Sequence, residues 1–491
     1  MGYPRPVPDE PARGAVDTPR PPRVRWATWM LLLLSAALVV ALPALWVASQ
    51  YNGSEVAGAL SYPVRDGWCE AGVFPGLGAH CFGDYTGQVL TARHDFGLPG
   101  FDPSTHPYLA DPSLAYNSLY APVGQFPHVV ADLLLGAGFG SGRTFYLFIS
   151  LLLVAAAAPA LWLAWQWRRS PFLVVPLIVI GVAAVPVIAV VDRGNSAGFV
   201  VPLLLGFALF AGKDPPWLAP GFVTAAALVR PQFILLALAL VALRRWRQAL
   251  AAVAAFVAIT VPSFALTAGG LTAGLSAWWS NVTGFRGVAD LTIDVNANIS
   301  LARGVVITGN WLAQWPGAIG AFGGWLSASA ITYPLGVVII AVVAFLLVVL
   351  AARTSLPRSV ALFIPLVIAG TASTISPSYY LMFALVIAAV VMGSRIAGSR
   401  DEGVFDAEGA TGWAGATWRW MVLATVTLSL VPIPWGGGTV GIGPAWVHSW
   451  LLRNIAVAWL VVLAAGLLWG LARALRAGRP RAAAGPAADV P

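Results

Sequence analysis

The sequence predicts an all-helical, polytopic membrane protein. Of its 491 residues, 58% are hydrophobic and only 10% are charged, and the mean hydropathy is +0.79. A soluble globular protein carries about 25% charged residues, so that class is excluded. The segments 28–49 and 331–352 are apolar throughout, and each is long enough to cross a bilayer as a helix. A barrel would need short alternating strands in place of these continuous apolar runs.

The chain divides into tails, a transmembrane core and a short linker. Both tails are rich in Arg and Pro, and we expect them to be disordered in the cytoplasm. Two long polar loops, 50–121 and 269–328, interrupt the core and are predicted to lie on the outer side. The predicted divisions are a tail over 1–27, a core over 28–395, a cytoplasmic linker over 396–417, additional helices over 418–472 and a tail over 473–491. The predicted spans are 28–49, 122–138, 144–166, 172–191, 197–211, 217–243, 247–267, 331–352, 358–373, 378–393, 418–434 and 450–472.

The net charge of +8 comes almost wholly from arginines that lie between apolar spans and in the tails. This distribution indicates positive-inside anchoring and not nucleic-acid binding. It predicts a multi-pass protein of the plasma membrane with both termini in the cytoplasm. Termini on one side require an even number of crossings, and the apolar runs give about twelve.

Two arrangements of residues 122–243 give that number. In the first, 122–138 crosses the membrane and 217–243 is one long helix. In the second, which we favour, 122–138 is a shallow re-entrant helix and 217–243 is a pair of short helices that meet at Arg230-Pro231. The second arrangement places Lys213 inside and keeps Arg230 away from the bilayer centre, where a charge costs several kcal/mol.

Charged residues interrupt two apolar runs. Asp192-Arg193-Gly194-Asn195 separates two spans, and Arg230-Pro231 breaks another. Such a loop can be a simple turn with a local ion pair. Alternatively, Arg193 and Arg230 bind an anion at the membrane surface, because the planar guanidinium donates in a geometry that suits phosphate. Both interpretations stay open on sequence alone.

The first long loop contains carboxylates, histidines and both cysteines. Asp84 precedes a segment, 86–93, that is predicted to be helical, which places a carboxylate near a helix start where a general base can meet a substrate. Cys69 and Cys81 form a disulfide if the loop faces an oxidising compartment. The histidines of this region are His80, His94, His106 and His128. Their irregular spacing matches no metal-binding motif, so no metal ligands are assigned.

Several short motifs, in a fixed order along the chain, carry a resemblance to a known family. They are Asp84-Tyr85, Asp111-Pro112, Tyr116, Asn195, Val229-Arg230-Pro231, Arg244-Arg245-Trp246-Arg247, Asn298-Ile299-Ser300 and Ser378-Tyr379-Tyr380. From about residue 30 to 395 the chain resembles glycosyltransferase family 87, which belongs to the GT-C class. Within that family it is most similar to the arabinofuranosyltransferases that add α-(1→3) branches to mycobacterial arabinan. It departs from the family at Arg230-Pro231, where Lys-Pro is usual.

The resemblance implies a GT-C fold, a reaction and a set of roles. The donor is a sugar on a polyprenyl phosphate, used at the outer face of the membrane, and the acceptor is a glycan or glycolipid. Asp84 is the expected catalytic base of an inverting transfer. The residues expected to bind the donor phosphate or sugar are Arg230, Arg193, Asn195, Tyr379 and Tyr380. Further substrate contacts are expected from Tyr85, Asp111, Tyr116 and Asn298.

Several properties stay open at this stage. The donor sugar is arabinofuranose or mannose, and the acceptor, the linkage and the oligomeric state are undetermined. Dependence on a divalent cation is open too, because GT-C enzymes of both kinds exist. The alternative function is a transporter or flippase for a lipid-linked glycan. Such proteins commonly show broken helices at matching positions in two halves, and Arg230-Pro231 has no counterpart in the second half.

Overall fold

The computed structural model describes residues 26–52, 83–99, 116–133, 137–211, 213, 215–292, 298–332, 335–373, 376, 378–393, 403–408, 412–431 and 445–477. The regular elements within these ranges are α-helices and short 3₁₀-helices (η), which confirms the predicted all-helical class. The first half contains α1 (Trp26–Asn52), α4 (Gly83–Asp95), α5 (Pro122–Ala131), α6 (Ala137–Ala156), α7 (Ala158–Gln166), α8 (Pro171–Val182), α9 (Val185–Arg193), η2 (Ser196–Phe199) and α10 (Val200–Phe210). The remainder contains α11 (Leu218–Val229), η3 (Pro231–Leu236), α12 (Ala237–Ala242), α13 (Trp246–Ser263), η4 (Phe264–Leu266), α14 (Gly270–Thr292), α15 (Leu301–Leu312), α16 (Ala318–Thr332), α17 (Leu335–Arg353), α18 (Arg358–Thr371), η5 (Ser378–Leu381), α19 (Met382–Met392), α20 (Val404–Ala407), α21 (Gly412–Leu430) and α22 (Ala445–Ala477).

Several of these helices are long and apolar enough to cross a membrane. In the described ranges, three helices meet this length and composition by themselves, namely Trp246–Leu266, Gly336–Arg353 and Asn454–Arg476. Two bent pairs raise the number to five if each pair is one span, namely Leu147–Ala156 with Ala158–Gln166 and Phe172–Val182 with Val185–Val191. The structure therefore supports a multi-pass membrane protein.

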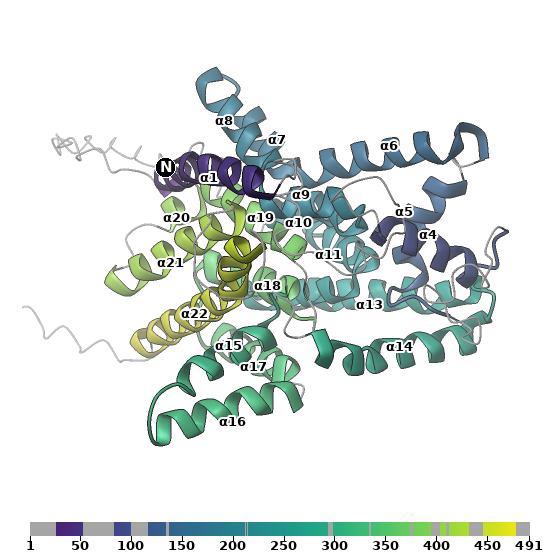
Figure 1. Cartoon of the computed structure of the whole chain (residues 1–491). Helices are drawn as coiled ribbons and strands as arrows, with labels where there is room; N and C mark the ends of the chain where they lie inside the picture. Colours follow the sequence, from purple (N-terminus) through teal and green to yellow (C-terminus); the bar gives the residue numbers. More distant parts are fainter. Residues whose placement is uncertain are drawn as a thin grey trace, which may run out of the picture.

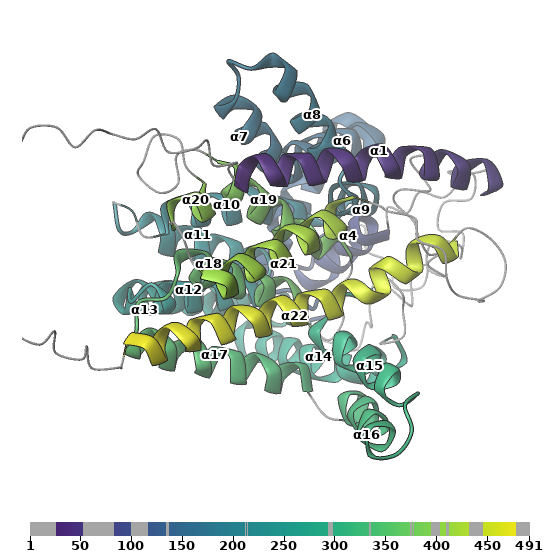
Figure 2. The ribbon, with the colours of Figure 1, turned by 90° about the vertical axis from the view of Figure 1, so that its left-hand side faces the viewer.

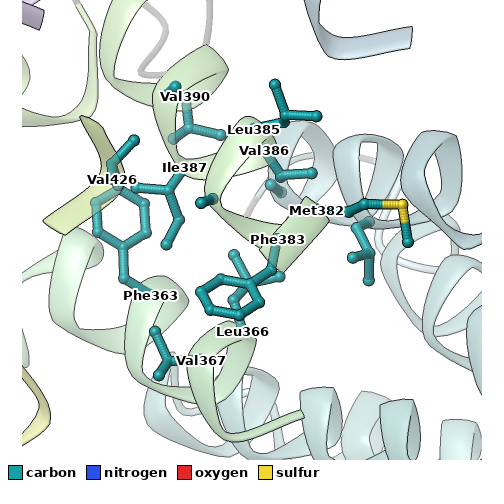
Figure 3. Packing of buried hydrophobic residues seen from close by; sticks show 14 of the residues in the cluster. Phe363, Leu366, Val367, Met382, Phe383, Leu385, Val386, Ile387, Val390 and Val426 are labelled. Carbon is teal, nitrogen blue, oxygen red and sulfur yellow. The ribbon is translucent and has the colours of Figure 1, made fainter. Parts of the chain in front are cut away.

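Helices α18 and α19 form the centre of the bundle and are buried along almost their whole length. Figure 3 shows Phe363 of α18 and Phe383 of α19 packed together with Val426 of α21. Helix α21 packs between α1 and α22, and the central pair is covered by α1 and α21 on α19 and by α22 on α18 (Figures 1 and 2). The segment that contains Tyr379 joins α18 to α19, so both of its ends are held by buried helices.

Basic residues from distant segments meet at one end of the bundle, which we call the basic end and define by Lys213, Arg245 and Arg358. Arg245 Nη1 donates to the carbonyl oxygen of Lys213 at 3.3 Å, and Arg358 Nη2 donates to that of Ala211 at 2.8 Å. Residues 213 and 245 thus lie on the same side, so 217–243 cannot cross as one helix. It forms α11 and the η3–α12 segment, which run out and back with Arg230 at the turn, as in the favoured arrangement.

The predicted span 122–138 is also short. Its helix α5 contains 10 residues and ends at Ala131. Such a helix is about 15 Å long, half of the roughly 30 Å of a bilayer core. Helix α5 by itself is therefore too short to cross, and whether 122–138 forms a shallow re-entrant helix stays a prediction.

The predicted outer loop 269–328 is largely helical, because it contains α14, α15 and α16 (Figure 1). A Cβ on Gly309 of α15 would lie 2.7 Å from the backbone nitrogen of Ser327. Small residues allow such close helix contacts in membrane proteins. Residues 304–352 include no charged side chain, so the loop has the composition of buried or lipid-facing helices despite its glycines.

Candidate functional site

Helix α9 ends in a turn that fixes Asn195. Gly194 adopts φ +62°, and the N–H groups of Gly194 and Asn195 close the helix on the carbonyl oxygens of Val191 and Val190. Glycine adopts this left-handed conformation without the steric penalty of a Cβ. Asn195 then caps η2, because its Oδ1 accepts from the N–H of Ala197 at 2.9 Å. The Asp-Arg-Gly-Asn break therefore holds one amide side chain in a defined orientation.

Asp84 lies in the first turn of α4, which packs against this turn. A Cβ on Gly194 would lie 2.7 Å from the Cβ of Tyr85, so the glycine also lets α4 approach. Asn195 Nδ2 donates to Asp84 Oδ2 at 2.9 Å, and Arg193 Nη1 lies 3.8 Å from the same oxygen. The side chain of Asp84 is 28% exposed, whereas Asn195 is 3% exposed. The carboxylate is thus anchored on its buried side and accessible on the other.

Arg230 stands at the break between α11 and η3. A residue before proline avoids the helical region, and Arg230 adopts φ −140° and ψ 106°. Its fully buried guanidinium donates through Nη2 to Asn195 Oδ1 and lies over the Tyr120 ring, 3.7 Å from the ring centroid. Its Nε and Nη1 have no hydrogen-bond partner among the described residues. One amide, that of Asn195, therefore connects the Asp84 carboxylate to the Arg230 guanidinium. We call Asp84, Asn195 and Arg230 the polar cluster.

The 3₁₀-helix η5 brings two tyrosines to the polar cluster. The rings of Tyr379 and Tyr380 lie 4.9 Å apart, and each residue is 5% exposed. Both interact electrostatically with Arg230, and Tyr379 also interacts with Asp84. These residues lie almost 300 positions from Asp84 in the sequence, so the fold and not local spacing brings them together.

Asn298 ties down the backbone that precedes η5. Its Oδ1 accepts from the N–H groups of Ser300 and Ser376, each at 3.0 Å, and Ile299 N donates to Ser376 O at 2.7 Å. The residue is 1% exposed. These two hydrogen bonds to backbone give Asn298 a positioning role for the tyrosine segment.

A buried network holds Tyr120 beneath Arg230. Asp95 is fully buried and accepts from Asn117 N at 2.7 Å, Ser118 N at 3.1 Å and Gln125 Nε2 at 2.9 Å. This carboxylate fixes both sides of the segment that carries Tyr120. Burial raises the pKa of Tyr120 and outweighs the opposing effect of Arg230, so a neutral ring faces the guanidinium.

Tyr116 belongs to the same network. Its hydroxyl donates to Tyr120 O and accepts from Gln125 Nε2 at 2.6 Å, and the residue is fully buried. Burial raises the pKa of Tyr116, so the hydroxyl stays protonated and can donate. The structure therefore places Tyr116 where it supports the Tyr120 segment, away from any exposed surface.

Tyr85 lies between the polar cluster and a buried histidine. Its ring centroid is 4.8 Å from that of Phe148 and 5.9 Å from that of His128. Burial raises the pKa of Tyr85 to about 12. His128 is fully buried, and its ring lies against the Gly194 backbone. Burial, and second the charge of Arg230, lower the pKa of His128 to about 3, so the imidazole is neutral.

An apolar groove of 590 Å³ opens between α5, α6, η2 and the end of α11. Pro127 and Ala131 of α5 line it on either side of His128 in the sequence, and Phe148 contributes the ring that contacts the imidazole. Val229, directly before Arg230, lines the opposite wall. The groove thus reaches from the outside of the bundle to the residues next to the polar cluster.

The structure assembles most of the residues expected from the sequence. Asp84, Arg193, Asn195, Arg230 and Tyr379 lie together, with two guanidinium groups against one carboxylate. Such a site has a formal charge of +1 and suits an anion. The expected contacts Asp111 and the cysteines Cys69 and Cys81 lie outside the described residues. Within the described ranges, no three His, Cys, Asp or Glu side chains converge in a way that could hold a metal ion.

Two residues of the site were missed from the sequence. Tyr120 has no motif of its own, and its role follows from the loop geometry that Asp95 imposes. His128 was recorded only as a histidine near the first loop. Its position in an otherwise apolar helix segment is the signal that could have pointed to it.

Comparison with known proteins adds no relative. No protein-family model matches the chain, and no curated protein or solved structure matches it either.

Proposed function

We propose that this protein is a membrane glycosyltransferase. It transfers arabinofuranose or mannose, with inversion, from a polyprenyl-phosphate donor to a glycan or glycolipid of the cell envelope. The observation that carries the proposal is the hydrogen-bonded chain Asp84–Asn195–Arg230, which joins a partly exposed carboxylate to a buried guanidinium. A general base and a phosphate-binding cation, held at a fixed separation, are the groups that this reaction needs.

The reaction assigns a role to each member of the cluster. The acceptor hydroxyl oxygen attacks the anomeric carbon while its proton passes to Asp84. The bond from that carbon to the phosphate oxygen breaks, and its electron pair stays on the phosphate. Arg230 donates from Nε and Nη1 to the departing phosphate and stabilises the developing charge. General-base assistance of this kind contributes about 10²–10⁴-fold to the rate.

The proposal includes a GT-C-type bundle of about twelve membrane segments, with the polar cluster at the outer face of the plasma membrane. The support for this orientation is that the basic end and the polar cluster lie at opposite ends of α18. Arg358 begins α18 at the basic end, and η5 with Tyr379 follows the other end of that helix. Basic residues mark the cytoplasmic side of membrane proteins, so the polar cluster then faces outward and both termini are cytoplasmic.

The test is sugar transfer by purified protein. Synthetic polyprenyl-phosphoarabinose and polyprenyl-phosphomannose, each with a labelled sugar, are incubated with short acceptor glycans and wild type or Asp84→Asn. The matched control is Asp132→Asn. Asp132 forms an ion pair at 2.9 Å with Arg93, which lies in the same helix as Asp84, and Asp132 is outside the polar cluster.

We expect transfer from one donor by wild type and by the control, and a loss of at least 100-fold in Asp84→Asn. Equal activity of Asp84→Asn and wild type would remove the base from the proposal. If folded wild type transfers sugar from neither donor but moves the lipid-linked sugar between leaflets, the protein is a flippase instead.

A further inference from the structure

Tyr120 covers one face of the Arg230 guanidinium. The guanidinium carbon lies 3.7 Å from the centroid of the ring, and the arginine is fully buried. At the edge of the same plane, Nη2 donates to Asn195 Oδ1. Because a guanidinium is planar, a contact on its face and a hydrogen bond at its edge together fix its orientation. Its Nε and Nη1, which have no hydrogen-bond partner in the part of the chain that the structure describes, are therefore held in one direction.

Helix α14 adds a second hold on the segment that carries this ring. Trp278 Nε1 donates to Leu119 O at 3.1 Å, and Asn281 Nδ2 donates to Tyr116 O at 2.7 Å. The hydrogen bonds of Asp95 fix the same segment from α4 and α5. Three helices therefore determine where the ring lies, and two of them, α4 and α14, come from different long loops of the sequence.

The start of α5 also packs directly against the backbone that leads into Arg230. A Cβ on Gly124 would lie 3.0 Å from Val229 O and 3.3 Å from the Cβ of Tyr120. The absence of a side chain at position 124 thus lets these two segments meet. The ring and the guanidinium are attached to backbone segments in direct contact, which leaves little freedom to either.

Packing alone does not account for an aromatic ring at position 120. An aliphatic side chain would fill the same space, but it lacks the negative face that attracts a cation. This attraction is strongest where the pair is removed from water, as it is around the buried Arg230. The plane of an arginine stacks on such a ring, whereas a lysine presents a point charge on a flexible stem. The pair of side chains therefore suits an arginine in one fixed orientation.

We propose that Tyr120 is a positioning residue that acts through Arg230: its ring holds the guanidinium plane so that the unpaired donors Nε and Nη1 meet the phosphate of the donor. The identity of the phosphate rests on the proposed function. The ring contacts Arg230, and it makes and breaks no bond in the substrate.

Binding of farnesyl phosphate, a short analogue of the polyprenyl-phosphate product, tests this role in detergent micelles. Tyr120→Leu, Arg230→Lys and the double variant form a cycle with wild type, and Tyr120→Phe keeps the ring. The matched control is Phe264→Leu, because Phe264 is a fully buried ring that packs on Tyr116, 5.4 Å between centroids, outside the polar cluster. Thermal unfolding of each variant checks that it is folded.

We expect Tyr120→Leu to weaken binding about tenfold or more when residue 230 is arginine. In the Arg230→Lys background the same change should cost less than about threefold, since a lysine has no plane for the ring to hold. Tyr120→Phe should stay within about threefold of wild type, and Phe264→Leu should melt lower without weaker binding. If Tyr120→Leu does not fold, Gly124→Ala takes its place, because it displaces the ring without changing its chemistry and should give the same loss.

Several results would overturn the proposal. Equal losses from Tyr120→Leu in the arginine and lysine backgrounds would assign the ring to packing. Binding by Tyr120→Phe as weak as that of Tyr120→Leu would show that the ring face is not what matters, and an equal loss in Phe264→Leu would point to general damage. An absence of binding by wild type would overturn it as well. The sugar-transfer assay is independent: coupled binding without transfer would refute the glycosyltransferase and keep the role of Tyr120, and transfer without coupling would do the reverse.

Discussion

Replacing Asn195 by Asp tests the connection at the centre of the polar cluster. The wild-type amide donates from Nδ2 to Asp84 Oδ2 at 2.9 Å, and a carboxylate at the same position would face that oxygen with a second negative charge. At that separation and an effective dielectric of about 20, two unit charges repel by about 6 kcal/mol. Water screens part of this repulsion because Asp84 is 28% exposed, and Arg230 Nη2 would offset a further part by pairing with the new carboxylate, so we expect about half of it to remain.

The pH dependence gives the sign of the effect. The folded variant can relieve the repulsion by keeping one shared proton between Asp84 and Asp at position 195. The folded state then binds more protons than the unfolded state, so stability falls as the pH rises. Thermal unfolding in detergent should show Asn195→Asp close to wild type at pH 5 and clearly less stable at pH 8. Transfer activity should be lost at neutral pH, where the base holds a proton.

The double variant Asp84→Asn with Asn195→Asp serves as the control. It reverses the hydrogen bond, since an amide at 84 donates to a carboxylate at 195 that also pairs with Arg230. Stability should return to within about 1 kcal/mol of wild type, whereas activity should not, because the carboxylate has moved to a buried position. If Asn195→Asp matches wild type at pH 8 and the double variant gains nothing over the singles, the two side chains are not coupled and our account of the cluster fails.

Three further variants test the surrounding structure by thermal unfolding and transfer. Gly194→Ala should lower the free energy of unfolding by about 1–3 kcal/mol, because it adds a Cβ at φ +62° and 2.7 Å from the Cβ of Tyr85. Its control is Gly221→Ala, where the new Cβ has no atom within 4 Å, so stability should be unchanged or rise by up to about 1 kcal/mol. Equal melting temperatures of the two variants would contradict this account. Asp95→Ala should cost about 3 kcal/mol or more, because three hydrogen bonds to a buried carboxylate are lost, and a shift below about 1 kcal/mol would show that the network is dispensable. Arg230→Met should melt no lower than wild type yet lose transfer by 100-fold or more; a stable variant with full transfer would remove the arginine from the reaction.

Charged and polar breaks in apolar spans made half of the site predictable. Arg193 and Asn195 interrupt one run and Arg230 another, and such interruptions are rare enough in a membrane protein to mark candidate sites. Their meeting with Asp84 is a property of the fold, seen in the hydrogen bonds of Asn195 to Asp84 and Arg230. Gly194 then positions Asn195 next to Asp84, since it ends α9 in a left-handed turn and leaves room for α4 to pack against that turn.

The remaining features depend on contacts that no local pattern contains. Tyr120 reaches Arg230 because Asp95, 25 residues earlier in the sequence, fixes its segment. A substrate contact of Tyr116 stays a prediction, and the structure shows its hydroxyl in two hydrogen bonds inside the protein. The helices of 269–328 were hidden by glycines, which weaken helix signals and here allow close packing of α15 on α16. The meeting of residues 213 and 245 depends on a hydrogen bond that the Arg245 side chain donates to the carbonyl oxygen of Lys213, a contact that arginine placement in the sequence could not reveal.

The energetics of Arg230 argue that the cluster exists for a ligand. A buried guanidinium is tolerated when its donors are satisfied, and here Asn195 takes one nitrogen and the Tyr120 ring covers a face. Two nitrogens of Arg230 stay unpaired among the described residues. A methionine at position 230 and a hydrophobic residue at position 195 would fill the same space at a lower cost in folding free energy. Under the proposed function, the fold keeps these two nitrogens of Arg230 as donors for the phosphate, at a cost to its own stability. The same deficit that destabilises the empty protein becomes binding energy when phosphate oxygens fill it, which is why stability and activity should move in opposite directions at this position.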